Sequence, residues 1–104
     1  MNRIEFTKKL AALLSQMVFA GEMPILDYVK RSAEEQKRLF ALGLSKCDGV
    51  KKISKHQIGL AADIYFQDGK ELVDPVCGLE YWHKIWSEMG GVKMIEWDKG
   101  HFEG

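Results

Sequence analysis

An aspartate lies in the middle of an otherwise apolar segment, and this residue restricts what the chain can fold into. The segment Gly59–Phe66 reads GLAADIYF and predicts a largely buried strand. A buried carboxylate at Asp63 is costly unless it is paired or bound to a metal ion. His56 lies seven positions earlier, and a turn at Gly59 would bring the two side chains to one ion. Zinc accepts nitrogen from histidine and oxygen from aspartate, so the segment favours a metal site, although this spacing also occurs by chance.

A third candidate ligand lies near the C-terminus, in the segment W-D-K-G-H-F-E at positions 97–103. A catalytic zinc site needs three protein ligands and one open position for water, and His101 is the candidate for the third ligand. Asp98, three residues earlier, is placed to reach a metal-bound water, and Glu96 is the alternative base. Trp97 is either a wall of the cleft or an ordinary core residue. By spacing alone, these segments permit a catalytic metal site without requiring one.

The remaining pattern predicts a single α+β domain over residues 1–104, with a small antiparallel sheet flanked by helices. A chain of 104 residues has room for one domain. Helices and strands mix without regular β/α alternation, which favours antiparallel pairing.

The first expected elements are a helix over Ile4–Ala20 ending at Gly21, a strand over Met23–Val29, and a helix over Ala33–Leu42 with a capping box of Ser32 and Glu35. They are followed by a loop over Leu44–Lys55 with a short strand at Val50–Ile53, a strand over Gly59–Phe66 and a hairpin turn at Gln67–Lys70. The last are a helix capped by Asp74 with Pro75 at its first position, ending at Gly90–Gly91, and short strands over Val92–Ile95 and His101–Glu103. The apolar stripe of the last helix includes His83, which we interpret as a core or boundary histidine.

Charge and cysteine content exclude several classes of protein. Fifteen basic and fifteen acidic residues cancel, and no basic stripe indicates a nucleic-acid partner. Cys47 and Cys77 make neither a disulfide framework nor a zinc-finger ligand set. No run approaches the roughly 20 apolar residues that cross a bilayer. The segment Leu10–Ala20, preceded by basic residues, has some features of a secretory signal, but its apolar residues recur at helical spacing. We therefore expect an amphipathic structural helix there.

Three motifs, in the same order along the chain, carry a resemblance to a known family. The string S-K-H-Q-I-G-L-A-A-D at 54–63 resembles the S-x-H-x-x-G-x-A-x-D signature of the M15 zinc peptidases. The string D-K-G-H-F-E at 98–103 resembles that family's D-x-x-H-F-E motif, and R-S-A-E-E-Q at 31–36 resembles its R-[ST]-x-E-E-Q segment. Together with the leading helix, the resemblance covers nearly the whole chain. It implies a fold like that of the hedgehog signalling domain and the DD-peptidases.

The resemblance also implies roles for individual residues. It makes His56, Asp63 and His101 the ligands of one Zn²⁺ ion, with Glu103 as a support for His101. It makes Asp98 the general base and later acid, and Arg31 the residue that contacts substrate and stabilises charge on the scissile carbonyl. It also makes Ser54 and Trp97 substrate-binding residues. The alternatives for Arg31 are capping of the helix end and pairing with Glu34 or Glu35. Ser54 is alternatively a residue that supports the ligands.

The activity implied is zinc-dependent hydrolysis of peptide bonds in the stem peptides of bacterial peptidoglycan. The family includes phage endolysins that cut the L-alanyl-D-glutamate bond, and this endopeptidase activity is the one we expect. A D,D-carboxypeptidase acting on D-Ala-D-Ala termini is an alternative, as is a non-catalytic, zinc-stabilised binding module on the same fold. We expect a phage or prophage protein that is monomeric, binds no nucleic acid and has no stable membrane association. It would accumulate in the bacterial cytoplasm before release to the cell wall, with export as the alternative.

Overall fold

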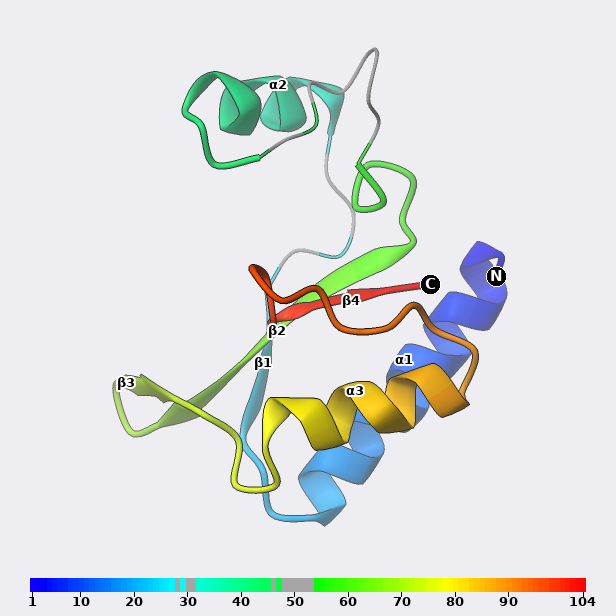
Figure 1. Cartoon of the computed structure of the whole chain (residues 1–104), viewed down its shortest axis with the longest axis vertical. Helices are drawn as coiled ribbons and strands as arrows, with labels where there is room; N and C mark the ends of the chain where they lie inside the picture. The colour runs from blue at the N-terminus through cyan, green and yellow to red at the C-terminus, as the bar shows by residue number, and fades with distance from the viewer. Residues whose placement is uncertain (28, 30–31, 46, 48–53) are drawn as a thin grey trace.

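The computed structural model describes residues 1–27, 29, 32–45, 47 and 54–104, and it has the expected α+β architecture (Figure 1). The described elements are helices α1 (Arg3–Phe19), α2 (Ala33–Ala41) and α3 (Leu79–Glu88), and strands β1 (Pro24–Leu26), β2 (Ala61–Asp68), β3 (Glu71–Val73) and β4 (His101–Glu103). The strands form one four-stranded antiparallel sheet. The predicted class, a small antiparallel sheet flanked by helices, is therefore confirmed.

Strand β2 is the centre of the sheet, because every other strand pairs with it. β4 pairs with its first residues, with Asp63 opposite His101, and β3 pairs with its last residues through a tight hairpin. β1 pairs with its middle, from Ile64 to Phe66. Along a strand, the N–H and C=O groups of one residue point to one edge, and those of the next residue point to the other edge. Because Asp63 C=O accepts from Asp27 N–H while Ile64 N–H donates to Gly100 C=O, β1 and β4 lie on opposite edges of β2.

The two faces of β2 have different functions. Ala62, Ile64 and Phe66 point into the hydrophobic core, where α1 and α3 pack against the sheet. Asp63 and Tyr65 alternate with them and point to the opposite face. Figure 1 shows α2 on that side of the sheet, away from α1 and α3. One strand therefore carries both core residues and site residues.

Helix α1 is the amphipathic helix that the sequence predicts for the N-terminal segment. Its buried side chains are Phe6, Leu10, Leu13 and Met17, all in the core. Asn2 accepts a hydrogen bond from Glu5 N–H at 2.8 Å, which caps the first turn. The helix ends before Gly21, whose φ of 88° is the left-handed conformation usual after a helix. No helix in the described part of the chain is both long and apolar enough to cross a membrane.

The N-cap of α2 is also confirmed. Ser32 Oγ accepts a hydrogen bond from Glu35 N–H at 3.1 Å, as the capping motif predicts. The Glu35 carboxylate contacts Arg38, three residues later, at 2.6 Å. The short strand expected at Val50–Ile53 lies outside the described residues.

The structure corrects three of the predicted boundaries and one predicted strand. The helix expected from Pro75 begins only at Leu79, because Gly78 has a φ of 89° and interrupts the helical backbone. The strand expected over Val92–Ile95 is absent from the described structure. Val92 N–H donates to Glu103 C=O at 2.8 Å, and the chain then continues as a coil. Strand β1 is three residues long, shorter than the predicted Met23–Val29, and β2 extends two residues into the predicted turn.

Candidate metal centre

A tight turn at residues 55–59 positions the first candidate ligand. Ser54 Oγ accepts from His56 N–H at 3.2 Å, and Leu60 N–H donates to Lys55 C=O at 2.8 Å. Gly59 closes the turn with a φ of 73°, which costs a non-glycine residue about 1–2 kcal/mol. The chain reverses there and enters β2, as the sequence predicts, so that His56 faces Asp63.

The other two candidate ligands are brought together by strand pairing. Asp63 in β2 lies directly opposite His101 in β4. His56 Nε2 lies 3.1 Å from Asp63 Oδ1 and 3.1 Å from His101 Nδ1, and the last two atoms are 3.5 Å apart. Four ligands held tetrahedrally at zinc distances of about 2.0–2.1 Å lie about 3.3 Å from one another. The three side chains therefore form a group close enough to hold a metal ion.

The environment of this group favours a bound cation. His56 is 3% exposed and Asp63 is 8% exposed. Burial raises the pKa of Asp63, but hydrogen bonds and charge from His101 and His56 outweigh it and lower the pKa to about 2. Burial lowers the pKa of His101, but hydrogen bonds to Asp63 and Glu103 and the negative charges of Asp63 and Asp98 raise it overall. The site thus keeps its carboxylate ionised and attracts positive charge, which a metal ion would supply in place of a proton.

A further carboxylate orients the third ligand. Glu103 Oε1 lies 3.1 Å from His101 Nε2, the ring nitrogen on the far side from Asp63. Such a contact fixes the tautomer and leaves Nδ1 free to face the metal position. His56 differs, because its buried Nδ1 atom has no hydrogen-bond partner among the described residues.

The group opens onto a cleft of about 730 Å³, which also contains the other candidate catalytic and binding residues that the structure describes. Asp98 lines it, with a half-exposed carboxylate 4.0 Å from His101 Nδ1, whereas Glu96 is not among the lining residues. Trp97 lies on the rim and is 76% exposed, which rules out its reading as core. Ser54 lines the cleft and is buried against His56. Arg31 lies outside the described residues.

Tyr65 and Asp27 are among the cleft residues that sequence reasoning did not find. Tyr65 lines the cleft from the same face of β2 as Asp63, and the two-residue period of a strand was the signal for it. Asp27 also lines the cleft, and its N–H donates to Asp63 C=O at 2.8 Å. Its place depends on the pairing of β1 with β2, for which the sequence carries no local signal.

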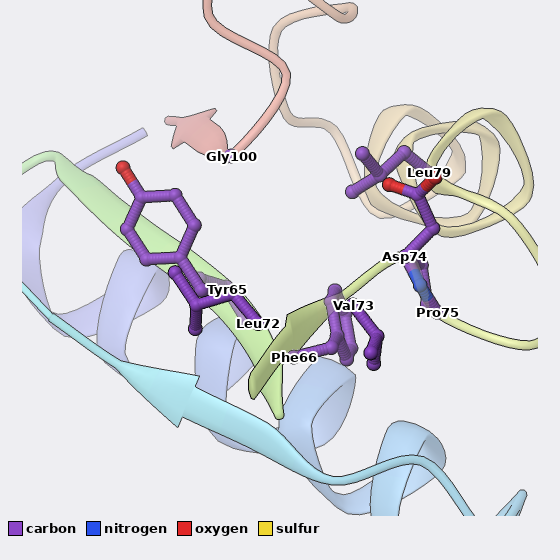
Figure 2. A pocket seen from close by; sticks show the side chains of 9 residues that line it. Tyr65, Phe66, Leu72, Val73, Asp74, Pro75, Leu79 and Gly100 are labelled. Carbon is purple, nitrogen blue, oxygen red and sulfur yellow. The ribbon is translucent and has the colours of Figure 1, made fainter. Parts of the chain in front are cut away.

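A second hollow of about 540 Å³ shares Tyr65 with the cleft (Figure 2). Figure 2 shows Tyr65 on one side of it, Leu79 and Asp74 on the other, and Gly100 above. Its walls are mostly apolar and include none of the three candidate ligands. Of these two hollows, only the larger cleft is lined by the three candidate ligands.

Comparison with protein-family models and with curated proteins returned no match for this chain. The resemblance to the M15 zinc peptidases accordingly depends on the three motifs.

Proposed function

We propose that this protein is a zinc-dependent peptidase that hydrolyses stem-peptide bonds of bacterial peptidoglycan, with the L-alanyl-D-glutamate bond as its target. The observation that carries the proposal is the meeting of three ligand atoms with 3.1–3.5 Å spacing and one more carboxylate, Asp98, in a single cleft. Two nitrogens and one carboxylate oxygen are a ligand set that catalytic zinc sites use, with the fourth position left for water or substrate.

The residues fit a zinc ion in chemistry as well as in spacing. Asp63 is ionised, His101 presents Nδ1 while Glu103 holds its other nitrogen, and His56 presents Nε2. When bound, zinc lowers the pKa of water toward about 7 and polarises a carbonyl oxygen. The fold we propose is accordingly the hedgehog/DD-peptidase-like one, in which the ligands come from the turn before β2, from β2 and from β4.

The proposed mechanism assigns the proton transfers to Asp98. Its carboxylate lies on the open side of the ligand group, 4.0 Å from His101 Nδ1, and is half-exposed to the cleft. As water attacks the scissile carbonyl carbon, Asp98 accepts one proton of that water. When the C–N bond breaks, Asp98 returns the proton to the departing amine, so that a carboxylic acid and an amine are released. Arg31 would stabilise the negative charge on the carbonyl oxygen in the same step.

The substrate assignment is supported by the motifs and by the size of the cleft. All three motifs resemble those of peptidoglycan peptidases and occur in the same order. A volume of about 730 Å³ lies within the 300–1,000 Å³ usual for pockets that bind a small ligand or a short peptide segment. Trp97 on the rim offers an exposed ring for contact with the substrate.

The test is direct. Purified protein, loaded with zinc or stripped with EDTA, is incubated with bacterial peptidoglycan, and the released peptides are identified by mass spectrometry. New amino termini at D-glutamate that depend on zinc and disappear in Asp98→Ala would support the endopeptidase. Release of terminal D-alanine would replace it with the carboxypeptidase. Tight binding of one zinc ion without any cleavage would contradict the proposed peptidase activity and favour the non-catalytic binding module.

A further inference from the structure

His83 connects α3 to the turn that carries Asp98, although the apolar stripe of its helix indicates only a core or boundary histidine. Its side chain is 3% exposed, and its Nε2 lies 2.7 Å from the backbone carbonyl oxygen of Lys99. A carbonyl oxygen only accepts, so Nε2 carries a hydrogen and donates it. The other ring nitrogen, Nδ1, has no hydrogen-bond partner in the described part of the chain. Among the described residues, the polar contact of this buried ring is therefore to the residue after Asp98.

The turn is held at two successive carbonyl groups. Within it, Asp98 N–H donates to Ile95 C=O at 3.0 Å and His101 N–H donates to Asp98 C=O at 3.1 Å. Gly100 C=O accepts from Ile64 N–H in β2 at 2.8 Å, and Lys99 C=O accepts from His83. The sheet therefore holds one end of the turn, and α3 holds the peptide next to Asp98.

Packing fixes the direction of the His83 ring. The ring lies flat on Phe102, with centroids 3.9 Å apart and planes 3° from parallel. Phe102 is fully buried and stands between His101 and Glu103 in β4. Both rings are buried, and in this stack Nε2 faces the Lys99 carbonyl oxygen.

We infer that His83 is a positioning residue, which holds Asp98 at its place beside the metal ligands through the Lys99 carbonyl. This inference rests on the proposed function, since it concerns the base of that reaction. His83 lies behind the turn and is not among the residues that line the cleft. The ligand His101 is held independently by its pairing with Asp63 and by Glu103, so loss of the His83 donor affects Asp98 and spares the metal-binding group.

Three variants separate the donor from the stack. His83→Phe keeps a flat ring on Phe102 and removes the donor, whereas His83→Gln keeps an N–H donor near the position of Nε2. Glu80→Gln is the matched control, because Glu80 makes the other contact of α3 with Lys99, an exposed ion pair at 3.8 Å. Each folded variant is compared with wild type by amide hydrogen exchange, zinc affinity, kcat and KM.

In His83→Phe we expect the Asp98 and His101 amides to exchange about tenfold faster, as loss of one hydrogen bond allows. The Val92 and Gly104 amides, which are bonded elsewhere, should keep their rates. We expect kcat to fall about tenfold, with KM and zinc affinity within about twofold of wild type. His83→Gln should restore most of both changes, and Glu80→Gln should cause neither.

Unchanged exchange at Asp98 and His101 in His83→Phe would overturn the inference, as would a fall in zinc affinity as large as the fall in kcat. Either result would make His83 an ordinary packing residue. Absence of hydrolysis by the wild-type protein would instead overturn the proposed function. The exchange measurement would still decide whether His83 holds the turn.

Discussion

His56 Nε2 and His101 Nδ1 lie 3.1 Å apart although 45 positions separate the two residues in the chain. Both also lie within 3.5 Å of Asp63 Oδ1, so three segments meet at one point. Two imidazoles and a carboxylate in this arrangement bind a cation far better than each does alone. The first predictions concern this group.

Replacing Asp63 with asparagine should abolish tight zinc binding. The substitution removes the negative ligand and leaves a neutral amide, so we expect zinc affinity to fall by more than the 10–100-fold usual for loss of an outer partner. Asp68→Asn is the matched control, because Asp68 is an exposed carboxylate at the other end of the same strand. Competition with a chromophoric chelator measures both affinities. Equal affinities in the two variants would contradict the assignment of Asp63.

Asp98→Asn should separate catalysis from metal binding. We expect zinc affinity close to that of wild type and hydrolysis slower by about 10²–10⁴-fold, because an amide cannot accept the proton of the attacking water. Glu96→Gln should retain activity, since Glu96 does not line the cleft. Measurement of kcat on a purified stem peptide decides between the two carboxylates. Loss of activity in Glu96→Gln alone would reverse their roles.

Zinc binding should depend on pH through His101, whose pKa is raised in the metal-free protein. The proton on His101 stabilises that protein at pH values below the ordinary pKa of 6.5, and this stabilisation is lost as the pH rises through the raised pKa. Zinc must displace the same proton, so its apparent affinity should weaken as the pH falls below the raised value. Calorimetry in buffers of different ionisation enthalpy should show net proton release near neutral pH. Zinc binding without proton release would contradict this account.

Glu22 should be a major contributor to stability. Its buried carboxylate accepts from Val76 N–H at 2.7 Å, Cys77 N–H at 3.1 Å and the Trp82 indole at 2.7 Å. Glu22→Gln replaces one carboxylate oxygen with an NH₂ group, which would face the same N–H donors without accepting from them. The substitution should therefore cost about 1–3 kcal/mol. Glu88→Gln, at the exposed end of α3, should cost almost nothing. Chemical denaturation of the metal-free variants measures both values.

The same carboxylate gives the opposite pH dependence to His101. Burial raises the pKa of Glu22, but the hydrogen bonds from Trp82, Cys77 and Val76 lower it overall, below the ordinary 4.5. Its contribution is therefore complete above pH 4.5 and is lost as the pH falls through the lowered value. Denaturation curves across acid pH should show this loss in wild type and a weaker one in Glu22→Gln.

Gly59→Ala should disturb the metal site more than its effect on stability suggests. Alanine is strained at a φ of 73°, and its Cβ would lie 2.8 Å from Arg3 Nε. Gly69→Ala in the hairpin has a similar φ of 63° with nothing within 4 Å, and it lies far along β2 from the ligands. Both variants should lose about 1–2 kcal/mol, but Gly59→Ala alone should weaken zinc binding. Equal zinc affinities would show that the turn does not position His56.

Most of the metal-binding group was predictable because its signals are local. Asp63 stands out as a charge in an apolar strand, and the glycine turn before it fits the reversal that brings His56 back. The pairing of β4 with β2 supplies His101 at the position that the C-terminal motif indicates. The first two features need only neighbouring residues and the two-residue period of a strand, whereas the pairing of β4 with β2 joins distant segments and was expected only from the motif.

Most of the contacts that sequence reasoning missed are long-range. The carboxylate of Glu22 bonds groups 54–60 positions away, and no local pattern distinguishes it from a solvent-exposed glutamate after a helix. Asp74 and Pro75 favour an earlier start of α3, but the backbone conformation of Gly78 delays it to Leu79. Asp27 reaches the cleft only through the register of β1, and His83 finds Lys99 only once α3 lies beside the last turn.

The alternation along β2 also limits how the gene for this protein can change. Asp63 and Tyr65 face the cleft while Ala62, Ile64 and Phe66 face the core, so loss or gain of one codon between them would exchange the two sets. A carboxylate would then enter the core, and isoleucine would take its place among the ligands. Over time this stretch can accept substitutions at single positions, but its length is fixed. Descendants of the chain should therefore differ in length elsewhere, for example at the open Gly69 turn.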